Sequence, residues 1–309
     1  MNEQFNKKPL VSVIVNCFNG SQYLKATLDS ILNQTYKYWE IIFWDNQSTD
    51  DSAKIFKKYK DERFKYYYAP QHTTLYHARN EAIKKTSGEI IAFLDTDDWW
   101  NENKLERQIS FFEDEKVGLV YSNFYLFYEN SKKIKIYNKK ILKSGYITKN
   151  IFKNFEIGIL TVLIRKVAYN SVLGFNNQYN FIGDFDLFIR LSSKWKIDCV
   201  QEPLAYYRIH NNNFSFVNNV NNVVEIEELE KWILDEKIIS YKNLIPYLYH
   251  VNKRIVFIKT IKYVNEGKLF KALKNIVFFP MGFNKIKLIL YFILPKKFYN
   301  KMGKFNRKS

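Results

Sequence analysis

The sequence has few cysteines and no segment that marks export. Only two cysteines, Cys17 and Cys199, occur among 309 residues, so no set of closely spaced disulfides can hold the fold together. The N-terminus, MNEQFNKKPLVSVIV, carries only a short apolar run, unlike a secretory signal. These two absences favour a reducing compartment, and we expect the protein in the cytoplasm. Cys17 has no neighbour in the sequence that would activate it, so we expect a small buried residue there.

Acidic residues are almost missing from the last quarter of the chain. Residues 241–309 contain 16 Lys and Arg but a single acid, Glu266, which gives them a net charge of +15. Residues 1–240 carry a net charge of only +2. This asymmetry predicts two parts with different roles.

Apolar runs and helical patterns alternate through the first hundred residues. Continuous apolar or β-branched runs, typical of buried parallel strands, occur as LVSVIVN, WEIIFW and EIIAFL, and FKYYYA predicts a further strand. Helical patterns separate them, among them SQYLKATLDSILNQ and TLYHARNEAIKKTSG, the second expected to end at Gly88. This order predicts βαβ units and a parallel sheet, whose ligands bind beyond the carboxyl ends of the strands.

The pattern loosens after residue 117. Further strands are predicted at VGLVYSNFYLFY, KKIKIYN, LTVLIRK and LAYYRIH, and a short helix at FDLFIRLSS. The asparagine-rich residues 211–222 predict a mobile loop or a lid. Beyond them the chain is helical and increasingly basic.

Three carboxylates follow the strand EIIAFL within four positions. Asp95, Asp97 and Asp98 would repel one another, and burying any of them without a partner is costly. Hard oxygen ligands at a strand end suit a divalent cation, which would relieve the repulsion and bridge to phosphate oxygens. The acids could equally be solvated and lie at the start of the helix NENKLERQISFF. Spacing alone leaves both interpretations open.

Five segments, in order along the chain, resemble the family 2 glycosyltransferases, which have the GT-A type fold. VSVIVNCFNG resembles the family's first strand, and ILNQTYKYWEIIFWDNQSTDDS resembles its second strand with an acidic turn. ARNEAIKKTSGEIIAFLDTDDWW resembles the helix that leads to its DXD motif. Its acceptor-side segment and its closing strand are matched by GFNNQYNFIGDFDLFIRLS and YRIHNNNFS. The resemblance covers roughly residues 9–215. It implies an α/β domain over residues 1–215, a Rossmann-like mixed sheet flanked by helices, followed by a helical, basic C-terminal region over residues 216–309.

The resemblance also implies an activity. Members of the family transfer a sugar from a nucleotide-diphosphate donor with inversion at the anomeric carbon, and here we expect a UDP-sugar. The expected acceptor is a glycan, such as a lipid-linked or cell-surface polysaccharide or lipooligosaccharide precursor. The expected cofactor is Mn²⁺ or Mg²⁺. The transferred sugar stays open between a hexose and an N-acetylhexosamine.

Roles at the nucleotide follow from the matched motifs. Asn16, Asp45 and Asn46 would hold the base, since an amide carbonyl can accept the N3–H of uracil. Arg79 would lie near the nucleotide or its phosphates. Asp45 and Asn46 could instead form an Asx-turn, and Arg79 could be an exposed helix cation.

Roles at the metal follow from the DXD motif and the closing strand. Asp95 and Asp97 match DXD itself and would bind the donor, and Asp97 and Asp98 share the expected metal contact. His210 in YRIH could supply a further metal ligand, or it could be structural.

The acceptor side has one clear candidate for a general base. Asp184 in IGDFDLFIR matches the family's catalytic acid, which would take the proton of the acceptor hydroxyl. The family usually has Glu-Asp here, so Gly183 removes a side chain that affects acceptor binding or loop geometry. Asp186 is expected to cap the helix or face solvent, and it would be the base if the alignment shifted. Of Trp99 and Trp100, we expect one to stack on a sugar and one to pack under the DXD loop.

The C-terminal run is apolar and basic together. Residues 276–294 approach the length of a membrane span, but Pro280, Asn284, Lys285 and Lys287 interrupt them. Because lysine near the centre of a span is costly, we expect a helix in the interface of the cytoplasmic membrane, held by apolar contact and anionic lipid. The alternative is an amphipathic helix packed on the catalytic domain.

Two other functions are compatible with parts of this sequence. A basic, aromatic-rich protein could bind nucleic acid, but no RNP, helix-turn-helix or zinc pattern occurs. A glycosyltransferase-like protein without activity would fit the loss at Gly183, but every DXD acid is retained. We therefore expect an enzyme and no nucleic-acid partner.

Overall fold

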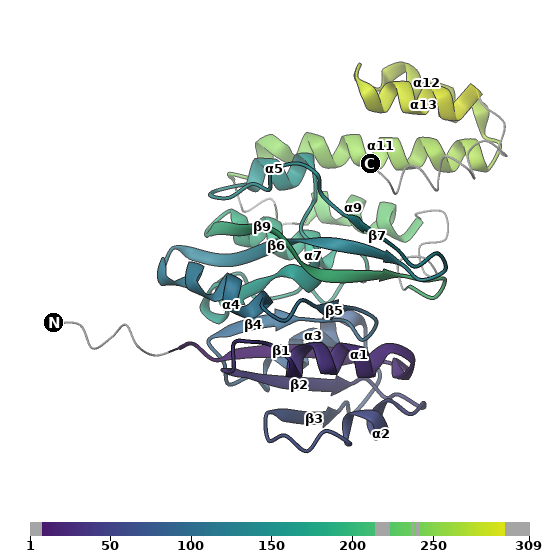
Figure 1. The fold of residues 1–309 in the computed structure, drawn as a ribbon. Coiled ribbons are helices and arrows are strands. Elements are labelled where there is room, and N and C mark those ends of the chain that lie inside the picture. The colour runs from purple at the N-terminus through teal and green to yellow at the C-terminus, as the bar shows by residue number, and fades with distance from the viewer. Residues whose placement is uncertain (1–7, 214–222, 236–237, 239–241, 294–309) are drawn as a thin grey trace. The chain divides into compact units, whose positions relative to one another are not determined.

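A computed structural model describes residues 8–213, 223–235, 238 and 242–293 of the chain (Figure 1). The chain divides into two compact units, Met1–Asn213 and Phe214–Ser309. The first unit contains the sheet and all of the residues expected at the active site, and the second is helical.

Four parallel strands form one half of the sheet in the first unit. Their order is β3-β2-β1-β4, and their bounds are β1 Val11–Cys17, β2 Trp39–Asp45, β3 Phe64–Tyr68 and β4 Ile90–Phe93. The connecting helices are α1 Ser21–Leu32, α2 Ser52–Phe56 and α3 Leu75–Ile83. β2 and β4 are buried along their whole length and β1 along nearly all of it, as their unbroken apolar runs require. The predicted βαβ arrangement is confirmed.

The second half of the sheet adds strands of both directions. These strands are β5 Trp99–Trp100, β6 Val117–Tyr128, β7 Lys133–Ile136, β8 Leu163–Arg165 and β9 Lys196–Ile209. β8 runs antiparallel to β4 and to β6, β6 pairs in parallel with β9, and β5 runs antiparallel to β9. The order is β3-β2-β1-β4-β8-β6-β9-β5, with β7 paired to β6 off this path. The expected mixed sheet with flanking helices is therefore confirmed.

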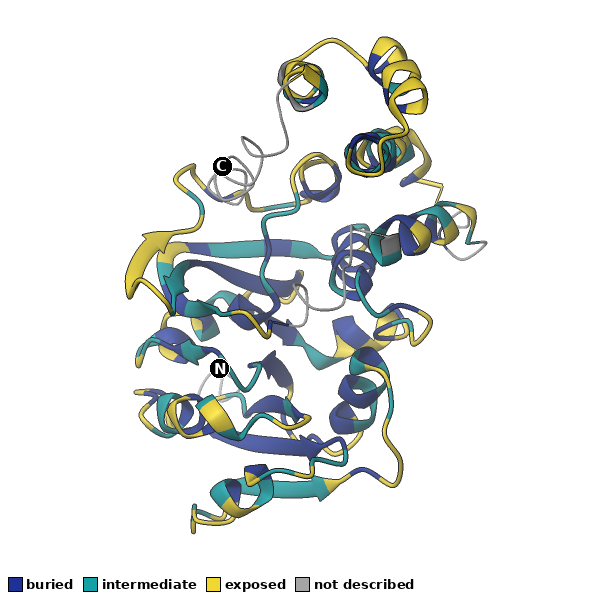
Figure 2. Cartoon of the chain, turned by 90° about the vertical axis from the view of Figure 1, so that its right-hand side faces the viewer, coloured by how far each residue is buried: buried dark blue, intermediate teal, exposed yellow. Residues whose placement is uncertain are grey.

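Helices between the later strands complete the first unit. They are α4 Lys104–Ile109, α5 Thr148–Lys153, α6 Lys166–Ser171 and α7 Gly183–Ser192, with short 3-10 turns at Ser110–Glu113 and Ile159–Thr161. Every residue of α7 except Asp184 is buried. Figure 2 shows that buried residues concentrate along the strands in the interior. α7 is thus a core helix with a single partly exposed acid at its start.

Local structure differs from the sequence expectations at two places. α3 ends at Ile83 and not at Gly88, because the Thr86 hydroxyl donates to the Ile83 carbonyl at 2.7 Å and closes the last turn. Trp99 and Trp100 form a short strand that the sequence pattern did not predict. The expected lid at residues 211–222 lies outside the described residues from 214 onward, so it stays a prediction.

The second unit consists of helices. They are α9 Val223–Leu234, α11 Leu248–Asn265, α12 Leu269–Phe278 and α13 Phe283–Ile293, with a 3-10 turn at Ile245–Tyr247. Ile276, Phe279 and Leu288 are buried together, and Val256, Phe257, Ile261 and Phe292 pack against them. α11, α12 and α13 therefore share a small core of their own.

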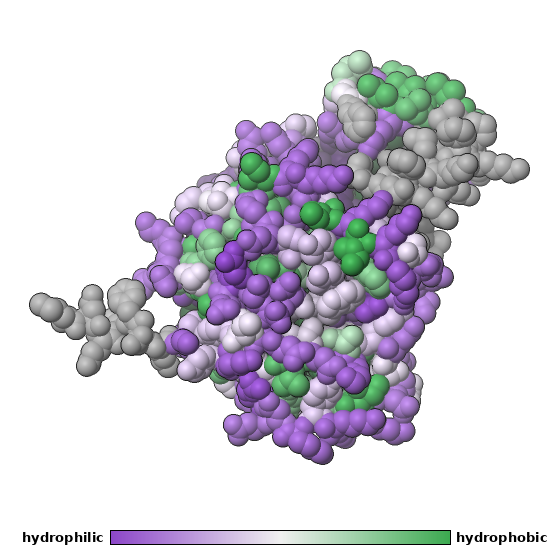
Figure 3. All heavy atoms as spheres, in the orientation of Figure 1, coloured by the Kyte–Doolittle hydropathy of each residue, from purple (hydrophilic) through white to green (hydrophobic). Residues whose placement is uncertain are grey.

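The apolar run after residue 275 forms two helices, so the expectation of one continuous helix there is wrong. Phe279 ends α12 with an extended backbone (ψ 135°), as expected for a residue that precedes proline, and α13 begins beyond Pro280. Among the described residues, none of the helices has the length and apolar character needed to cross a bilayer. Figure 3 shows apolar side chains gathered over α12 and α13, where Phe270, Phe278 and Met281 are about four-fifths exposed.

Candidate active site

The carboxyl ends of β1, β2 and β4 meet at one edge of the sheet. Asn16 and Cys17 of β1 pair with Trp44 and Asp45 of β2, and Asp95 follows β4 closely. Parallel pairing brings these residues together because all three strands point the same way. Three of the sequence-predicted segments therefore form one site.

The DXD loop is fixed from two sides. The Thr27 hydroxyl of α1 lies 2.9 Å from the Thr96 carbonyl oxygen and 2.8 Å from that of Asp98, and can donate to either. From β9, Arg208 donates its Nε–H to the Asp97 carbonyl and its backbone N–H to Asp98 Oδ1, each at 2.8 Å. The positions of the acids are thus set by backbone and side-chain contacts, without a ligand.

Asp97 and His210 are brought together by this arrangement. His210 Nε2 lies 3.0 Å from Asp97 Oδ2, and Asn213 Nδ2 lies 3.3 Å from the same oxygen. The side chains of Asp97 and His210 are 27% and 13% exposed, so both can be reached from solvent. The sequence placed these two residues in separate motifs, 113 positions apart.

Asp98 has a different environment from Asp97. It is 1% exposed, and burial raises the pKa of its carboxyl well above the usual value, with Asp97 and Asp95 adding to the rise. The backbone N–H of Arg208 opposes this shift by donating to Oδ1. Of the two acids expected to share a metal contact, Asp97 is therefore the accessible one.

Arg79 joins the DXD loop to the acceptor side. Its guanidinium donates to Asp95 Oδ1 at 2.8 Å and to Asp184 Oδ1 at 3.1 Å, although these residues lie 16 and 105 positions further along the chain. The side chain is only 2% exposed, so the interpretation of Arg79 as an exposed helix cation is wrong. Burial opposes its charge, but the carboxylates of Asp95 and Asp184 outweigh burial and raise the pKa of Arg79.

Asp184 is the partly exposed acid at the start of α7. Its side chain is 23% exposed, and burial raises its pKa from 3.8 to about 6. Arg79 and the hydroxyl of Tyr76 lower the pKa, whereas Asp95 raises it further. A carboxyl with a pKa of about 6 can hold or release a proton near neutral pH.

Tyr76 explains the glycine that precedes Asp184. A Cβ at Gly183 would lie 2.4–2.6 Å from atoms of the Tyr76 ring, a distance that excludes any side chain there without movement. Tyr76 is itself 3% exposed, packs on Phe175 at 5.0 Å, and accepts a hydrogen bond from the Asp184 N–H at 3.3 Å. The ring thus occupies the space that the family's glutamate would enter.

The expectation that Asp186 caps the helix or faces solvent is wrong. Asp186 is 1% exposed and forms a buried ion pair with Arg190, one turn later on α7, at 3.1 Å from Arg190 Nε. Arg190 also donates to the carbonyls of Val172 and Gly174. Asp186 therefore helps hold the 172–174 turn against α7, and its carboxylate is occupied within the core.

The residues expected at the base differ in how far their polar groups are already paired. Asp45 is fully buried and accepts the Ser48 N–H at 2.7 Å and the Tyr66 hydroxyl at 2.6 Å. Asn46 donates to the Thr73 carbonyl at 2.8 Å. These contacts match the alternative interpretation in which Asp45 and Asn46 organise their own turns.

The side-chain amide atoms of Asn16 are buried and, within the described part of the chain, unsatisfied. Among the described residues, neither its Nδ2 nor its Oδ1 has a hydrogen-bond partner, although both atoms are buried. An unsatisfied buried amide is costly, so a site that leaves one at a strand end suits a ligand with both a donor and an acceptor. The neighbouring Cys17 is 1% exposed and burial raises the pKa of its thiol, as expected for a structural cysteine.

The two tryptophans after the DXD loop both pack within the protein. Trp100 is 3% exposed and donates its Nε1–H to the Leu160 carbonyl at 2.8 Å. Trp99 stacks on Tyr206 at 4.8 Å, with the Arg208 guanidinium 4.6 Å from its ring. Trp100 is thus a core residue, and its packing under the loop and an acceptor contact of Trp99 stay predictions.

Several residues of the site had no separate signal in the sequence. Asn213 lies in a segment that resembles the family, whereas Tyr66 and Tyr76 lie outside the five quoted segments, and no spacing rule identifies the contacts of these residues. Arg208 lies within the YRIH segment and could have been selected there as a cation near an acidic loop. The contact of Tyr76 with Gly183 depends on two segments that only the fold brings together.

The order of this sheet and the acids at its strand ends define the GT-A type of glycosyltransferase. The sequence model of the family "Glycosyl transferase family 2" matches residues 12–171, and the chain belongs to that family. The match ends before Asp184 and His210, so those two residues lie outside it.

Two bacterial glycosyltransferases are similar to this chain over more than half of its length. "Putative teichuronic acid biosynthesis glycosyltransferase TuaG" of Bacillus subtilis is 32% identical over 214 residues, which are 68% of this chain and 83% of the relative. "UDP-Glc:alpha-D-GlcNAc-diphosphoundecaprenol beta-1,3-glucosyltransferase WfgD" of Escherichia coli is 32% identical over 183 residues, 59% of this chain and 69% of that protein.

Solved structures share the fold at low sequence identity. The mannosyltransferase PcManGT from Pyrobaculum calidifontis, in complex with GDP-Man and Mn²⁺, has a TM-score of 0.64 and 15% identity, over 98% of this chain and 85% of its own. S. aureus TarS 1–349 in complex with UDP-GlcNAc has a TM-score of 0.57 and 16% identity, over 86% and 89% of the two chains. At these identities the likeness establishes the GT-A fold alone.

Proposed function

We propose that this family 2 glycosyltransferase moves a sugar from a UDP-sugar to a lipid-linked or cell-surface glycan precursor, with inversion at the anomeric carbon. One observation carries the proposal. Arg79 bridges Asp95 of the DXD loop and Asp184 of α7, so a donor-side acid and an acceptor-side acid lie within reach of one guanidinium. A reaction between a bound donor and an entering hydroxyl needs that convergence.

Asp184 is proposed as the general base. It would accept the proton of the acceptor hydroxyl as that oxygen attacks the anomeric carbon from the face opposite the leaving diphosphate. Its pKa of about 6 suits this role, because the group is mostly ionised at neutral pH but can still hold a proton. Tyr76 and Arg79 would fix the orientation of the carboxylate through the contacts described above.

Asn16 is proposed to read the base of the nucleotide. The side-chain amide of Asn16 has one donor, Nδ2, and one acceptor, Oδ1, which match the carbonyl and the N3–H of uracil. Both atoms are buried and have no hydrogen-bond partner among the described residues. Asp45 and Asn46 would shape this part of the site through their contacts with Ser48, Tyr66 and Thr73.

The residues around Asp97 fit a divalent cation that takes few protein ligands. Asp97 Oδ2 and His210 Nε2 lie close together and are partly exposed, while Asp95 is bound to Arg79. The described residues contain no cluster of three or more acid, His or Cys ligands, so an Mg²⁺ or Mn²⁺ ion bound here would have to complete its shell with diphosphate oxygens and water. When bound, the ion would neutralise charge on the departing diphosphate.

The acceptor class is proposed from the relatives. TuaG is named for teichuronic acid biosynthesis, and WfgD is named for a diphosphoundecaprenol-linked sugar. Both names describe cell-envelope glycans, and membrane-linked precursors are a natural acceptor for a protein with exposed apolar and basic helices in its second unit. We accordingly propose peripheral association with the inner face of the cytoplasmic membrane.

The direct test is release of UDP from a panel of UDP-sugars with Mn²⁺, with and without a polyprenyl-diphosphate-linked sugar. Acceptor-dependent UDP release is expected from at least one donor, and Asp184→Asn should remove it while UDP binding measured by calorimetry is retained. If Asp184→Asn abolished UDP binding as well, Asp184 would belong to the nucleotide site and the base would have to be sought elsewhere.

A further inference from the structure

A cavity of about 470 Å³ lies between β6, the loop of residues 139–143 and α5. None of the residues proposed above for the donor, the metal or the base lines it. Its polar lining consists of Tyr121, three lysines, two asparagines and one acid, namely Lys139, Lys140, Lys143, Asn150, Asn154 and Glu156, and the remaining lining residues are isoleucines. Its size falls within the range of pockets that bind small molecules.

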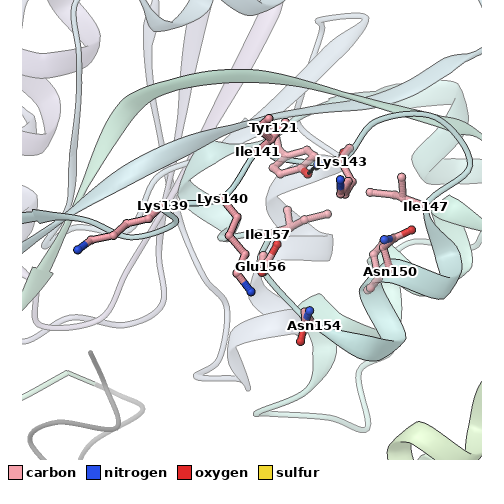
Figure 4. A pocket seen from close by; sticks show the side chains of 11 residues that line it. Tyr121, Lys139, Lys140, Ile141, Lys143, Ile147, Asn150, Asn154, Glu156 and Ile157 are labelled. Atoms are coloured by element: carbon pink, nitrogen blue, oxygen red, sulfur yellow. Dashed lines mark hydrogen bonds between the residues drawn. The ribbon is translucent and has the colours of Figure 1, made fainter. Parts of the chain in front are cut away.

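The cavity is embedded in a strongly cationic segment. Residues 130–155 contain eight lysines and no acid, although the first 240 residues together are nearly neutral. Within the described chain, no residue forms an ion pair with Lys139, Lys140 or Lys143. Figure 4 shows Lys140 and Lys143 among the other lining side chains, whereas Lys139 extends away from them. The cavity therefore presents the ammonium groups of Lys140 and Lys143 (Figure 4), neither of which forms an ion pair with Glu156, the one acid of the lining, among the described residues.

The loop that carries these lysines is held by the sheet. The Tyr121 hydroxyl donates to the Lys143 carbonyl at 2.7 Å and accepts the Lys143 N–H at 3.1 Å. Two residues later, Gly145 and Ile197 of β9 exchange backbone hydrogen bonds at 2.7 and 2.9 Å. A fixed backbone reduces the entropy lost when a ligand is bound by its side chains.

The opposite wall of the cavity is joined to the helix of the proposed base. In α5, the Thr148 hydroxyl donates to the Ser192 carbonyl of α7 at 2.8 Å. Phe152 and Phe155 contact the ring of Phe185, the residue after Asp184, at 6.0 and 5.5 Å. A ligand in the cavity would thus be bound by elements packed directly on α7.

We propose that this cavity binds the diphosphate group of the acceptor, a polyprenyl diphosphate that carries the growing glycan. Ammonium and amide N–H groups are the donors that phosphate oxygens require, and the isoleucines suit the first isoprenyl unit of the lipid. This inference rests on the proposed function, because it identifies the chemistry of that reaction's acceptor. It gives the protein two separate diphosphate sites, one for the donor at the strand ends and one for the acceptor here.

The test compares two double variants of the full-length protein that change the charge equally. Lys140→Glu with Lys143→Glu alters the cavity, and Lys149→Glu with Lys153→Glu alters exposed lysines of α5 that do not line it. Binding of farnesyl diphosphate and of inorganic pyrophosphate is measured by calorimetry with EDTA present, so that metal-dependent binding at the donor site does not contribute. Thermal unfolding confirms that each variant is folded.

We expect farnesyl diphosphate to bind the wild type more tightly than pyrophosphate does, and Lys140→Glu with Lys143→Glu to weaken its binding at least about tenfold. Lys149→Glu with Lys153→Glu should change it less than about threefold. Equal weakening by both pairs would mean attraction by net charge alone and would overturn the proposal, as would absence of binding to the wild type. UDP binding with Mn²⁺ is measured on the same samples: its absence from the wild type would contradict the proposed function, whatever the cavity binds.

Discussion

Asp184 and Asp186 lie two residues apart on one helix, and we expect opposite effects on stability when each is replaced by asparagine. Asp184 has a pKa of about 6 in the folded protein against a usual 3.8, because burial outweighs the shared contact with Arg79. Its charge therefore disfavours the native state. Asp186 has Arg190 as a buried partner of its own, so its charge is compensated in the core.

The size of the Asp184 effect follows from its pKa. Each pKa unit corresponds to about 1.4 kcal/mol, so the rise from 3.8 to about 6 is equivalent to about 3 kcal/mol at pH 7.5. Since 23% of the side chain is exposed, we expect Asp184→Asn to stabilise the protein by about 1–3 kcal/mol at that pH. Because the native pKa is raised, the contribution of this group to stability is present in full below pH 4 and is lost as the pH rises through 6. The gain from asparagine should therefore fall to about half at pH 5.

The matched control is Asp186→Asn, which leaves Arg190 buried without its carboxylate. Breaking a buried pair in this way typically costs about 3–5 kcal/mol, so the variant should unfold at a lower temperature at both pH values. The assay is thermal unfolding at pH 5 and pH 7.5, followed by circular dichroism. If Asp184→Asn lowered the unfolding temperature at pH 7.5 as Asp186→Asn does, the assignment of Asp184 as a buried, undercompensated acid would be refuted.

Four further outcomes are expected. The rate of sugar transfer at saturating donor should fall as the pH drops below about 6, because the base must be ionised, and a flat profile from pH 5 to 8 would contradict this. Asp184→Asn should lower kcat by about 10²- to 10⁴-fold. Gly183→Ala should lower the free energy of unfolding by about 1–3 kcal/mol, because the added Cβ meets the Tyr76 ring. In a double-mutant cycle, Tyr76→Ala should remove most of that loss, and additive effects of the two substitutions would argue against the contact. Transfer should stop in excess EDTA and recover with Mn²⁺, and Asp97→Asn should be nearly inactive without a change in unfolding temperature; full activity with the chelator would rule out a metal. Full-length protein should sediment with anionic vesicles at low salt, and replacing Phe270, Phe278 and Met281 by serine should reduce the sedimented fraction. Leu173, a residue of the first unit, is equally exposed, and Leu173→Ser should leave that fraction unchanged. Protein that stays in the supernatant at both low and high salt would contradict membrane association.

Most of the parallel half of the sheet could be predicted from sequence because three of its strands, β1, β2 and β4, are buried on both faces. Runs such as IIAF leave no alternative to a core strand, and the acids that follow them must then lie at one edge. Fewer features could be predicted for the segment after residue 117, because edge and antiparallel strands mix polar and apolar residues. β5 has only two residues and forms by pairing Trp99 and Trp100 with β9, which no local periodicity can reveal.

The partners of the site residues could not be predicted, because they depend on distant segments. The sequence named Arg79 and Asp184 through resemblance to a family, yet nothing local shows that the guanidinium reaches both Asp95 and Asp184. For Asp186, the partner is close in sequence, but its burial could not be predicted. Its i, i+4 spacing to Arg190 is visible in the sequence, but such pairs are usually exposed, and only the packing of α7 in the core makes this one structural.

The contrast between the two acids of α7 also gives a physical reason for assigning catalysis to Asp184. Both acids lie in the first turn of a helix whose other residues are all buried. Asp186 holds an arginine of its own, which also donates to two backbone carbonyls, so removing its charge would disrupt a packed turn. Asp184 shares Arg79 with Asp95, and a cation divided between two carboxylates stabilises each of them less than an undivided one would. The resulting carboxyl is partly exposed, directed by Tyr76, and able to exchange a proton near neutral pH, which are the properties that a base for an incoming hydroxyl requires.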